Sequence, residues 1–205
     1  MRKLEVVEPA TPLPIVANVS RVVTKVVDRI TGDRVDFPLL VAAACVEALK
    51  NFGIRSQVMY GQAAWIAIMQ DNSPAWAGCW GENLHFWVAT EFGEVVDLNA
   101  SVGHRKVGAL HSPPILWCAH VPSFYRYLPE GVAELELTSE SDLKRFETVL
   151  REIGEKCQPS LVGDEPEFPN EPVLCPDRRL LDDSQQTFAH FDRALSVHGI
   201  PGAPI

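Results

Sequence analysis

Hydrophobic side chains recur every three or four residues near the start of the chain. Valines and an isoleucine keep this spacing through residues 20–30, which predicts a helix with one apolar face. Asn18 or Ser20 is expected to cap this helix, because a short polar side chain can accept a bond from the first backbone N–H groups.

The next hydrophobic stretch, residues 37–53, is apolar almost all round, a pattern typical of a buried central helix. Asp36 is its expected N-cap, and Pro38 lies in the first turn, where its missing N–H costs no helical bond. Gly53 is expected to end the helix.

Beyond residue 53 the hydrophobic period changes from that of a helix to that of strands. Residues 70–83 are expected to form a loop, and residues 158–176, rich in proline and acidic side chains, an extended segment. The expected strands are one long or two shorter ones in residues 54–69, a hairpin in residues 84–101 and a strand in residues 131–138. The remaining helices are expected in residues 139–157, with Ser139 and Asp142 as a capping box, and in residues 178–197.

This order predicts an α+β fold in which a buried central helix packs on an antiparallel β-sheet, with extra helices toward the C-terminus. Residues 1–157 are expected to form the α+β domain. Residues 158–205 are expected to pack on the same domain as an extended segment and a helix.

The hairpin places chemically useful residues on one face. If Gly93 supplies the left-handed position of a three-residue turn, Thr90 faces Glu94 and Trp87 faces Asp97. His85 then becomes the diagonal neighbour of Asp97, with their Cα atoms roughly 7–8 Å apart. The opposite face is expected to pack into the core; it carries Phe86, Val88, Val96 and Leu98.

A carboxylate bonded to one imidazole nitrogen fixes the tautomer of the ring and stabilises its protonated form. This is the orienting half of a catalytic triad. His85 and Asp97 can also form a purely structural pair, and the spacing alone leaves both interpretations open.

The order of these motifs resembles that of the transglutaminase-like and papain-like cysteine proteinase superfamily. The resemblance rests on "ALKNFGIRSQVMYG", "HFWV" and "VVDLN", and covers roughly residues 36–100. It implies a cysteine-proteinase-like fold, with His85 as the base and Asp97 as its orienting partner. It also implies a cysteine nucleophile at the start of the buried helix.

The expected nucleophile position does not hold a cysteine. Counting about four turns back from Gly53 leads to Pro38, whereas Cys45 lies two turns deeper among alanines. A thiol among apolar side chains is disfavoured as the thiolate, so Cys45 is either a nucleophile at an irregular helix start or a small buried hydrophobe. Cys79, expected in a loop six residues before His85, is the other candidate.

Tryptophans are concentrated around the predicted site. Trp65, Trp80 and Trp87, together with Cys79, are expected to line a cleft suited to a flat or apolar ligand. They can equally be core and rim packing.

Composition narrows the functional classes. The chain of 205 residues has a formal net charge of −9, which argues against nucleic acid or an anionic membrane as a partner. Five scattered cysteines without a CxxC pair favour reduced thiols in the cytoplasm over disulfides. We expect no cofactor, no metal, no signal peptide and no membrane span, and the sequence does not define the oligomeric state.

Two hypotheses follow. The first is a non-catalytic relative that keeps the cleft and the His–Asp pair and binds a small molecule or a peptide. The second is a cysteine-dependent amide hydrolase or acyltransferase that uses a Cys–His–Asp triad.

Overall fold

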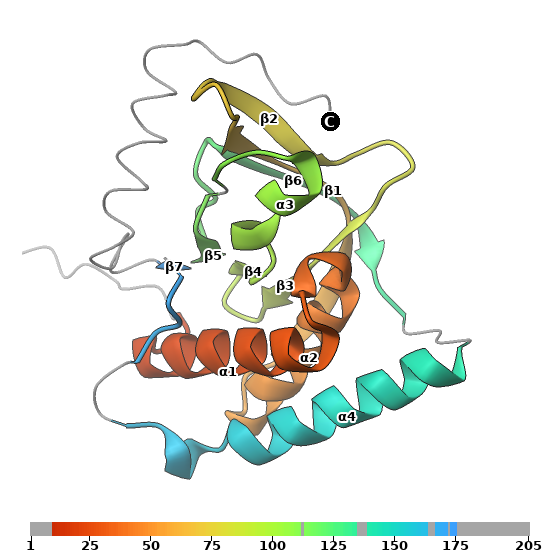
Figure 1. Cartoon of the computed structure of the whole chain (residues 1–205). Helices are drawn as coiled ribbons and strands as arrows, with labels where there is room; N and C mark the ends of the chain where they lie inside the picture. The colour runs from red at the N-terminus through yellow and green to blue at the C-terminus, as the bar shows by residue number, and fades with distance from the viewer. Residues whose placement is uncertain (1–9, 112, 135–138, 164–166, 172, 176–205) are drawn as a thin grey trace, which may run out of the picture.

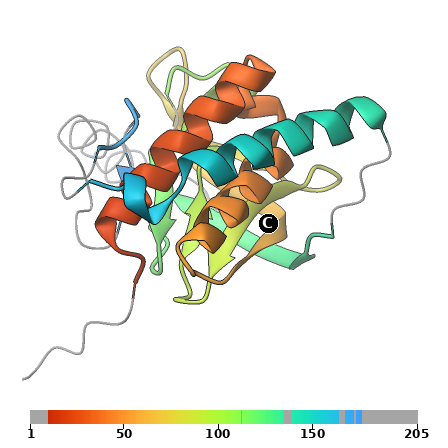
Figure 2. The ribbon, with the colours of Figure 1, turned by 90° about the horizontal axis from the view of Figure 1, so that it is seen from below.

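Three long helices lie on one side of a curled β-sheet (Figure 1). The computed structural model describes residues 10–111, 113–134, 139–163, 167–171 and 173–175. The helices are α1 (Leu13–Thr31), α2 (Pro38–Asn51) and α4 (Glu140–Lys156). Figure 2 shows them side by side across the sheet. This is an α+β architecture, as the sequence predicts.

Helix α1 begins earlier than its hydrophobic pattern predicts. It starts after Pro12, so Asn18 and Ser20 are buried inside it and do not cap it. The predicted cap is therefore wrong, because Val16 and Val19 extend the apolar face toward the N-terminus. Its buried face packs on α2 and α4.

Helix α2 is the central helix that the sequence predicts. It begins at Pro38 and ends at Asn51. Gly53 follows in the turn with a φ of 72°, which is readily adopted only by glycine. Phe37 occupies the N-cap position, while Asp36 ends the short 3₁₀ helix η1 (Arg34–Asp36), so the predicted Asp36 cap is wrong. The helix packs against α1, α4 and the sheet, which accounts for its lack of a polar face.

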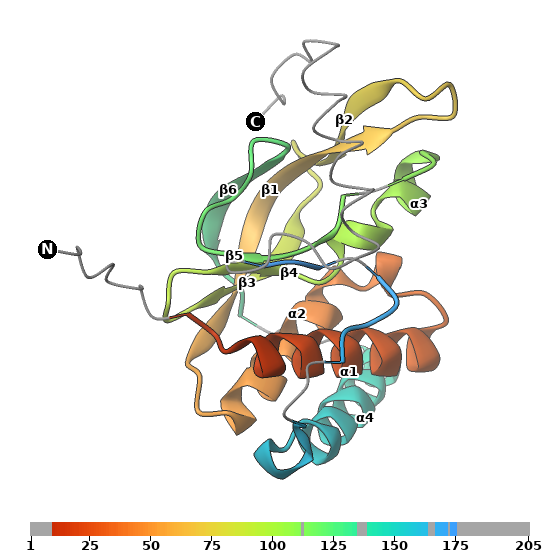
Figure 3. The ribbon, with the colours of Figure 1, turned by 90° about the vertical axis from the view of Figure 1, so that its left-hand side faces the viewer.

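The sheet is organised around its longest strand, β1. Strand order is β2-β1-β3-β4-β5-β7, and β6 also pairs with β1. Figure 3 shows how the sheet curls. The strands are β1 (Ser56–Ile68), β2 (Pro74–Cys79), β3 (His85–Thr90), β4 (Val95–Asp97), β5 (Ile115–Cys118), β6 (Tyr125–Val132) and β7 (Val173–Leu174).

Pairing along β1 places β2 and β3 on the same edge. Residues 56–61 pair with β3, residues 63–68 pair with β2, and residues 59–65 pair with β6 on the opposite edge. All these pairs are antiparallel, but β5 and β7 are parallel. The sheet is therefore mixed, which corrects the expectation of a purely antiparallel one.

Other predicted elements have different boundaries. Residues 70–83 contain strand β2, so they are not simply a loop. Strand β6 begins before the predicted strand 131–138, whose last four residues lie outside the described part, as does the predicted helix 178–197. Helix α4 matches its prediction, although Ser139 makes no capping side-chain bond.

The two faces of the sheet belong to different apolar clusters. One lies between the sheet and the helices and includes Val88 and Cys45; the other lies inside the curl and includes Trp65 and Tyr125. His85 and Asp97 lie on the face of the second cluster, whereas Cys45 belongs to the first. Among the helices of the described residues, none has the length and apolarity required to cross a membrane.

Candidate functional site

The β3–β4 hairpin has the register that the sequence predicts. Val88 faces Val96, and the backbone N–H of Thr90 donates to the carbonyl of Glu94 over 3.1 Å. Gly93 has a φ of 74°, which supplies the left-handed residue of the turn. His85, Trp87 and Asp97 therefore share the inner face, while the predicted core residues of the hairpin pack toward the helices.

Asp97 is fully engaged in hydrogen bonds. Its Oδ2 lies 2.7 Å from Nε2 of His85 and also accepts a 2.7 Å bond from the hydroxyl of Tyr127. Its Oδ1 accepts the backbone N–H groups of Asn99 at 2.9 Å and Ala100 at 3.0 Å. The carboxylate is thus held by two side chains and by the backbone that follows β4.

His85 and Asp97 form a buried ion pair, being 4% and 1% exposed. Burial lowers the pKa of His85, but the charge and hydrogen bond of Asp97, with a contribution from Cys79, raise it to about 10. Burial raises the pKa of Asp97, but the charge and hydrogen bonds around it leave this pKa below its ordinary value. Both shifts favour the charged pair, in which Nε2 of the imidazolium donates to the carboxylate.

Cys79 lies next to His85 at the edge of β1. In the strand register Cys79 faces Ala63 and His85 faces Gly61, so both side chains share the inner face. Two residues along a strand correspond to roughly 7 Å. Cys79 also contributes to the raised pKa of His85. Since Nε2 is bonded to Asp97, Nδ1 is the imidazole nitrogen that this carboxylate does not occupy.

Cys79 is half-buried, whereas the other four cysteines are buried. It is the last residue of β2 and so is held by strand pairing, which corrects its expected position in a loop. A thiol that is both accessible and adjacent to an imidazolium has the surroundings of reactive cysteines.

The structure does not bring Cys45 together with His85. Cys45 is 1% exposed in the cluster between helices and sheet, whereas His85 points to the other face. Burial, with a contribution from Cys157, raises the pKa of the Cys45 thiol far above its ordinary value. These surroundings are those of a small buried hydrophobe.

Aromatic rings enclose the His85–Asp97 pair. The ring centroid of Trp65 lies 5.8 Å from that of His85, and Trp87 stacks on His85 at 6.5 Å. Tyr127 meets Trp87 edge-on at 5.1 Å. Trp80 follows Cys79 directly and is half-buried. Of the predicted cleft residues, Trp65 and Trp87 therefore contact the imidazole, and Cys79 lies on the same face two positions along β1.

A groove opens beside this cluster on the inner face of the sheet. Its volume is about 720 Å³, within the usual range for small-molecule sites. Trp87 and Tyr127 form the wall that it shares with the ion pair. The groove's other lining residues include the uncharged side chains Met59, Ala89, Val95 and Tyr125, and also the charged Arg126.

Sequence reasoning missed Tyr127. The alternation of Tyr125 and Tyr127 in "FYRYLP" was a signal that both tyrosines share a face of a strand. Strand β6 pairs with β1, which is distant in the sequence, and the alternation of the two tyrosines does not predict this pairing. In the described part of the chain, no cluster of three or more His, Cys, Asp or Glu side chains could hold a metal ion.

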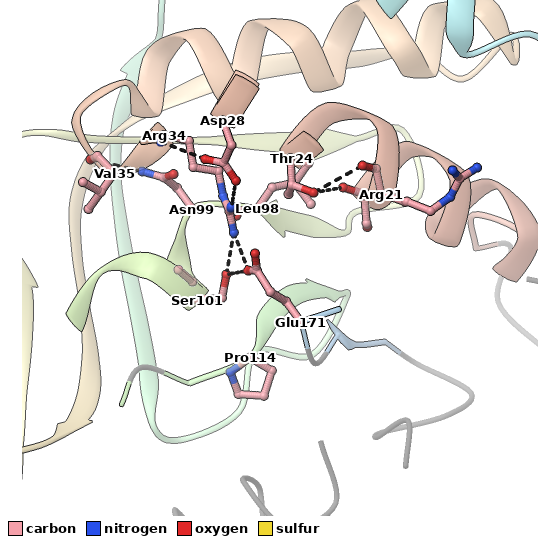
Figure 4. Close-up of polar contacts among 12 residues, drawn as sticks. Arg21, Thr24, Asp28, Arg34, Val35, Leu98, Asn99, Ser101, Pro114 and Glu171 are labelled. Carbon is pink, nitrogen blue, oxygen red and sulfur yellow. Dashed lines mark hydrogen bonds and ion pairs between the residues drawn. The ribbon is translucent and has the colours of Figure 1, made fainter. Parts of the chain in front are cut away.

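A buried arginine fixes the backbone that carries Asp97 (Figure 4). Arg34 is fully buried, its Nε donates to the carbonyl of Leu98 over 3.2 Å, and its guanidinium also bonds Ser101 at 3.0 Å. Asp28 and Glu171 pair with the same guanidinium. The segment after β4 is therefore anchored to α1 and to the C-terminal segment.

Comparison with known proteins gives no functional assignment. No protein-family profile matches the chain, and no curated protein matches it. A solved structure known as a genomics target is similar to it at 13% identity and a TM-score of 0.45, over 82% of this chain and 88% of that one. A likeness of this degree carries no argument about function, so the site must be interpreted from its own chemistry.

Proposed function

We propose that the protein is a cysteine-dependent acyl-transfer enzyme, a hydrolase or acyltransferase acting on amide or ester carbonyls. Cys79 is the nucleophile, His85 the general acid and base, and Asp97 its orienting partner. The observation that carries this proposal is the position of Cys79 and His85 on one face at one edge of β1, with Asp97 bonded to the far side of the imidazole.

The resemblance of residues 36–100 to the transglutaminase-like and papain-like superfamily supports the same reaction class. The proposed nucleophile differs in position from that superfamily's pattern, since it lies at the end of a strand and not at the start of the buried helix. The proposal therefore depends on the geometry around His85 more than on the resemblance.

The proposed reaction starts from the thiolate of Cys79 beside the protonated imidazole. The sulfur of Cys79 attacks the substrate carbonyl carbon, and a tetrahedral intermediate forms. Its collapse breaks the bond to the leaving amine or alcohol, which takes the Nδ1 proton of His85 and leaves a thioester. Water or an acceptor then attacks the thioester while giving a proton to Nδ1, and the sulfur leaves with its electron pair.

Asp97 makes this proton transfer directional. Because its Oδ2 holds the proton on Nε2, the other imidazole nitrogen exchanges its proton with the reacting groups. The carboxylate stays ionised throughout, since backbone N–H groups and Tyr127 also stabilise it.

The test is acylation by p-nitrophenyl acetate, followed by peptide mapping. We expect an acetyl thioester on Cys79, release of p-nitrophenolate, and loss of both in Cys79→Ala. Cys45→Ala is the matched control and should keep both. Acetylation absent from Cys79, or unchanged release in Cys79→Ala, would contradict the proposal.

A second candidate function is binding of a small neutral apolar molecule, which the mostly apolar lining of the groove favours. A neutral fluorescent probe such as N-phenyl-1-naphthylamine should bind saturably. Met59→Arg should abolish this binding, because it places a second charged side chain among the apolar side chains of the groove. Leu143→Arg, on the exposed face of α4, is the control that should not change it. Equal binding by both variants would place the probe elsewhere.

A further inference from the structure

Tyr127 reaches Asp97 across the interior of the curled sheet. Strand β6 lies on one edge of β1, whereas β3 and then β4 follow on the other edge. Figure 3 shows the curl that brings these distant strands to face one another. Tyr127 is opposite Ala63 of β1, and the adjacent inner position is Gly61. These small residues leave the space over which the tyrosine ring extends.

The hydroxyl of Tyr127 and the imidazole of His85 share one acceptor atom. Each lies 2.7 Å from Oδ2 of Asp97, while Oδ1 is occupied by backbone N–H groups. A hydrogen bond from Tyr127 draws negative charge from the same oxygen that holds the imidazolium. The strength of the His85–Asp97 interaction therefore depends on this tyrosine.

We infer that Tyr127 is a positioning residue that sets how firmly Asp97 holds the proton of His85. The consequence for the reactivity of Cys79 rests on the proposed function. The effect on the His85–Asp97 pair does not, because it follows from the shared oxygen alone. The same ring forms a wall of the groove, so this residue also joins the groove to the ion pair.

Other titratable groups around the pair come from the surrounding strands. Cys79 of β2 contributes to the raised pKa of His85, and burial together with the charge of Asp97 raises the pKa of Tyr125 of β6. Cys118 of β5 makes a smaller contribution to the raised pKa of both tyrosines, Tyr125 and Tyr127. Of the two tyrosines, Tyr127 bonds the carboxylate, whereas Tyr125 donates to the carbonyl of Pro114. Tyr125 is therefore a matched control.

The experiment compares Tyr127→Phe with Tyr125→Phe in the full chain. The imidazole of His85 is titrated by NMR, and the pH dependence of Cys79 alkylation by iodoacetamide is measured in parallel. Without the hydroxyl, Oδ2 keeps more negative charge, so the titration of His85 in Tyr127→Phe should move to higher pH. Tyr125→Phe should leave it unchanged.

A second substitution keeps the inference testable if Tyr127→Phe does not fold. With 3-fluorotyrosine at position 127, the more acidic hydroxyl donates a stronger bond, and the titration should move to lower pH. An unchanged titration in folded protein carrying either substitution would overturn the inference. Failure of Cys79 to alkylate in wild-type protein would count against the proposed function alone, since the His85 titration still measures the role of Tyr127.

Discussion

His85 and Asp97 are two buried groups whose charges depend on each other. Removing one member of such a pair leaves an uncompensated charge, which typically costs about 3–5 kcal/mol. When the imidazolium is lost, three other hydrogen bonds still hold Asp97 in its ionised form, so such variants leave a buried carboxylate without its cation. Stability and chemistry at this site are therefore properties of the pair.

Replacing His85 by Phe should lower the free energy of unfolding by about 3 kcal/mol at neutral pH, because it leaves the Asp97 carboxylate buried without its cation. Urea denaturation measures the change. His120→Gln, at an exposed histidine, is the control and should have no effect beyond about 0.5 kcal/mol. Equal stability of the two variants would show that the ion pair is not formed in solution.

The pair also makes stability depend on pH. The folded-state pKa of His85, about 10, lies above its ordinary value of 6.5. Its stabilising contribution is complete below about pH 6.5 and is lost as pH rises toward 10. Asp97 has a lowered pKa, so its contribution is present above its ordinary value of 3.8 and is lost in more acidic solution.

We therefore expect the stability advantage of wild-type protein over His85→Gln to fall by at least about 1 kcal/mol between pH 6 and pH 10. Urea titrations of both proteins across this range measure it. A constant difference would mean that the pKa of His85 is not raised in the folded state.

Among the elements, the hairpin was the most predictable and β2 the least. Alternating apolar residues around Gly93 specify both the register and the inner face of the hairpin. Strand β2 has the sequence "PAWAGC", whose small residues have weak strand preference. It becomes a strand because it pairs with the second half of β1. The residues of β2 alone do not predict this pairing.

Close packing between β2 and β1 leads to a prediction at Gly78. A Cβ on Gly78 would lie 2.1 Å from the carbonyl oxygen of Ala63, and its φ of 149° is unfavourable for other residues. Gly78→Ala should destabilise the protein by about 2 kcal/mol and displace the adjacent Cys79. Thermal unfolding and thiol labelling measure the two effects.

Gly154 in helix α4 is the contrasting position. A Cβ there meets no atom within 4 Å, so Gly154→Ala should stabilise the protein by about 0.5–1 kcal/mol. If Gly78→Ala did not destabilise the protein either, the close approach of β2 to β1 at this position would be contradicted.

At the scale of the whole molecule, the α+β plan follows from the sequence, but the enclosure of the site does not. The buried helix and its place on the sheet follow from residues 37–53 being apolar all round. The contact of Tyr127 with Asp97 joins strands that are far apart in the sheet and depends on its curl. The position of Cys79 beside His85 likewise depends on strand pairing, so the sequence pattern does not favour Cys79 over Cys45 as the nucleophile.

The Arg34 cluster links α1, the segment after β4 and the C-terminal segment through one guanidinium. Glu171→Ala removes one anion of this cluster and should lower the free energy of unfolding by about 1–2 kcal/mol, with faster amide exchange at residues 173–175. Glu167→Ala is the matched control, because Glu167 is largely exposed and lies 4.0 Å from Arg21. Equal effects of the two substitutions would show that the cluster does not anchor this segment.

The central claim is that Cys79 is activated by its contact with His85. The most direct measurement is the rate of alkylation of each cysteine by iodoacetamide at about pH 6, where an ordinary thiol with a pKa near 8.5 reacts slowly. We expect Cys79 to react first, and at least about tenfold more slowly in His85→Gln, which keeps a hydrogen-bonding side chain beside Asp97. Slow reaction of Cys79 in the wild-type protein, or the same rate in His85→Gln, would contradict the account.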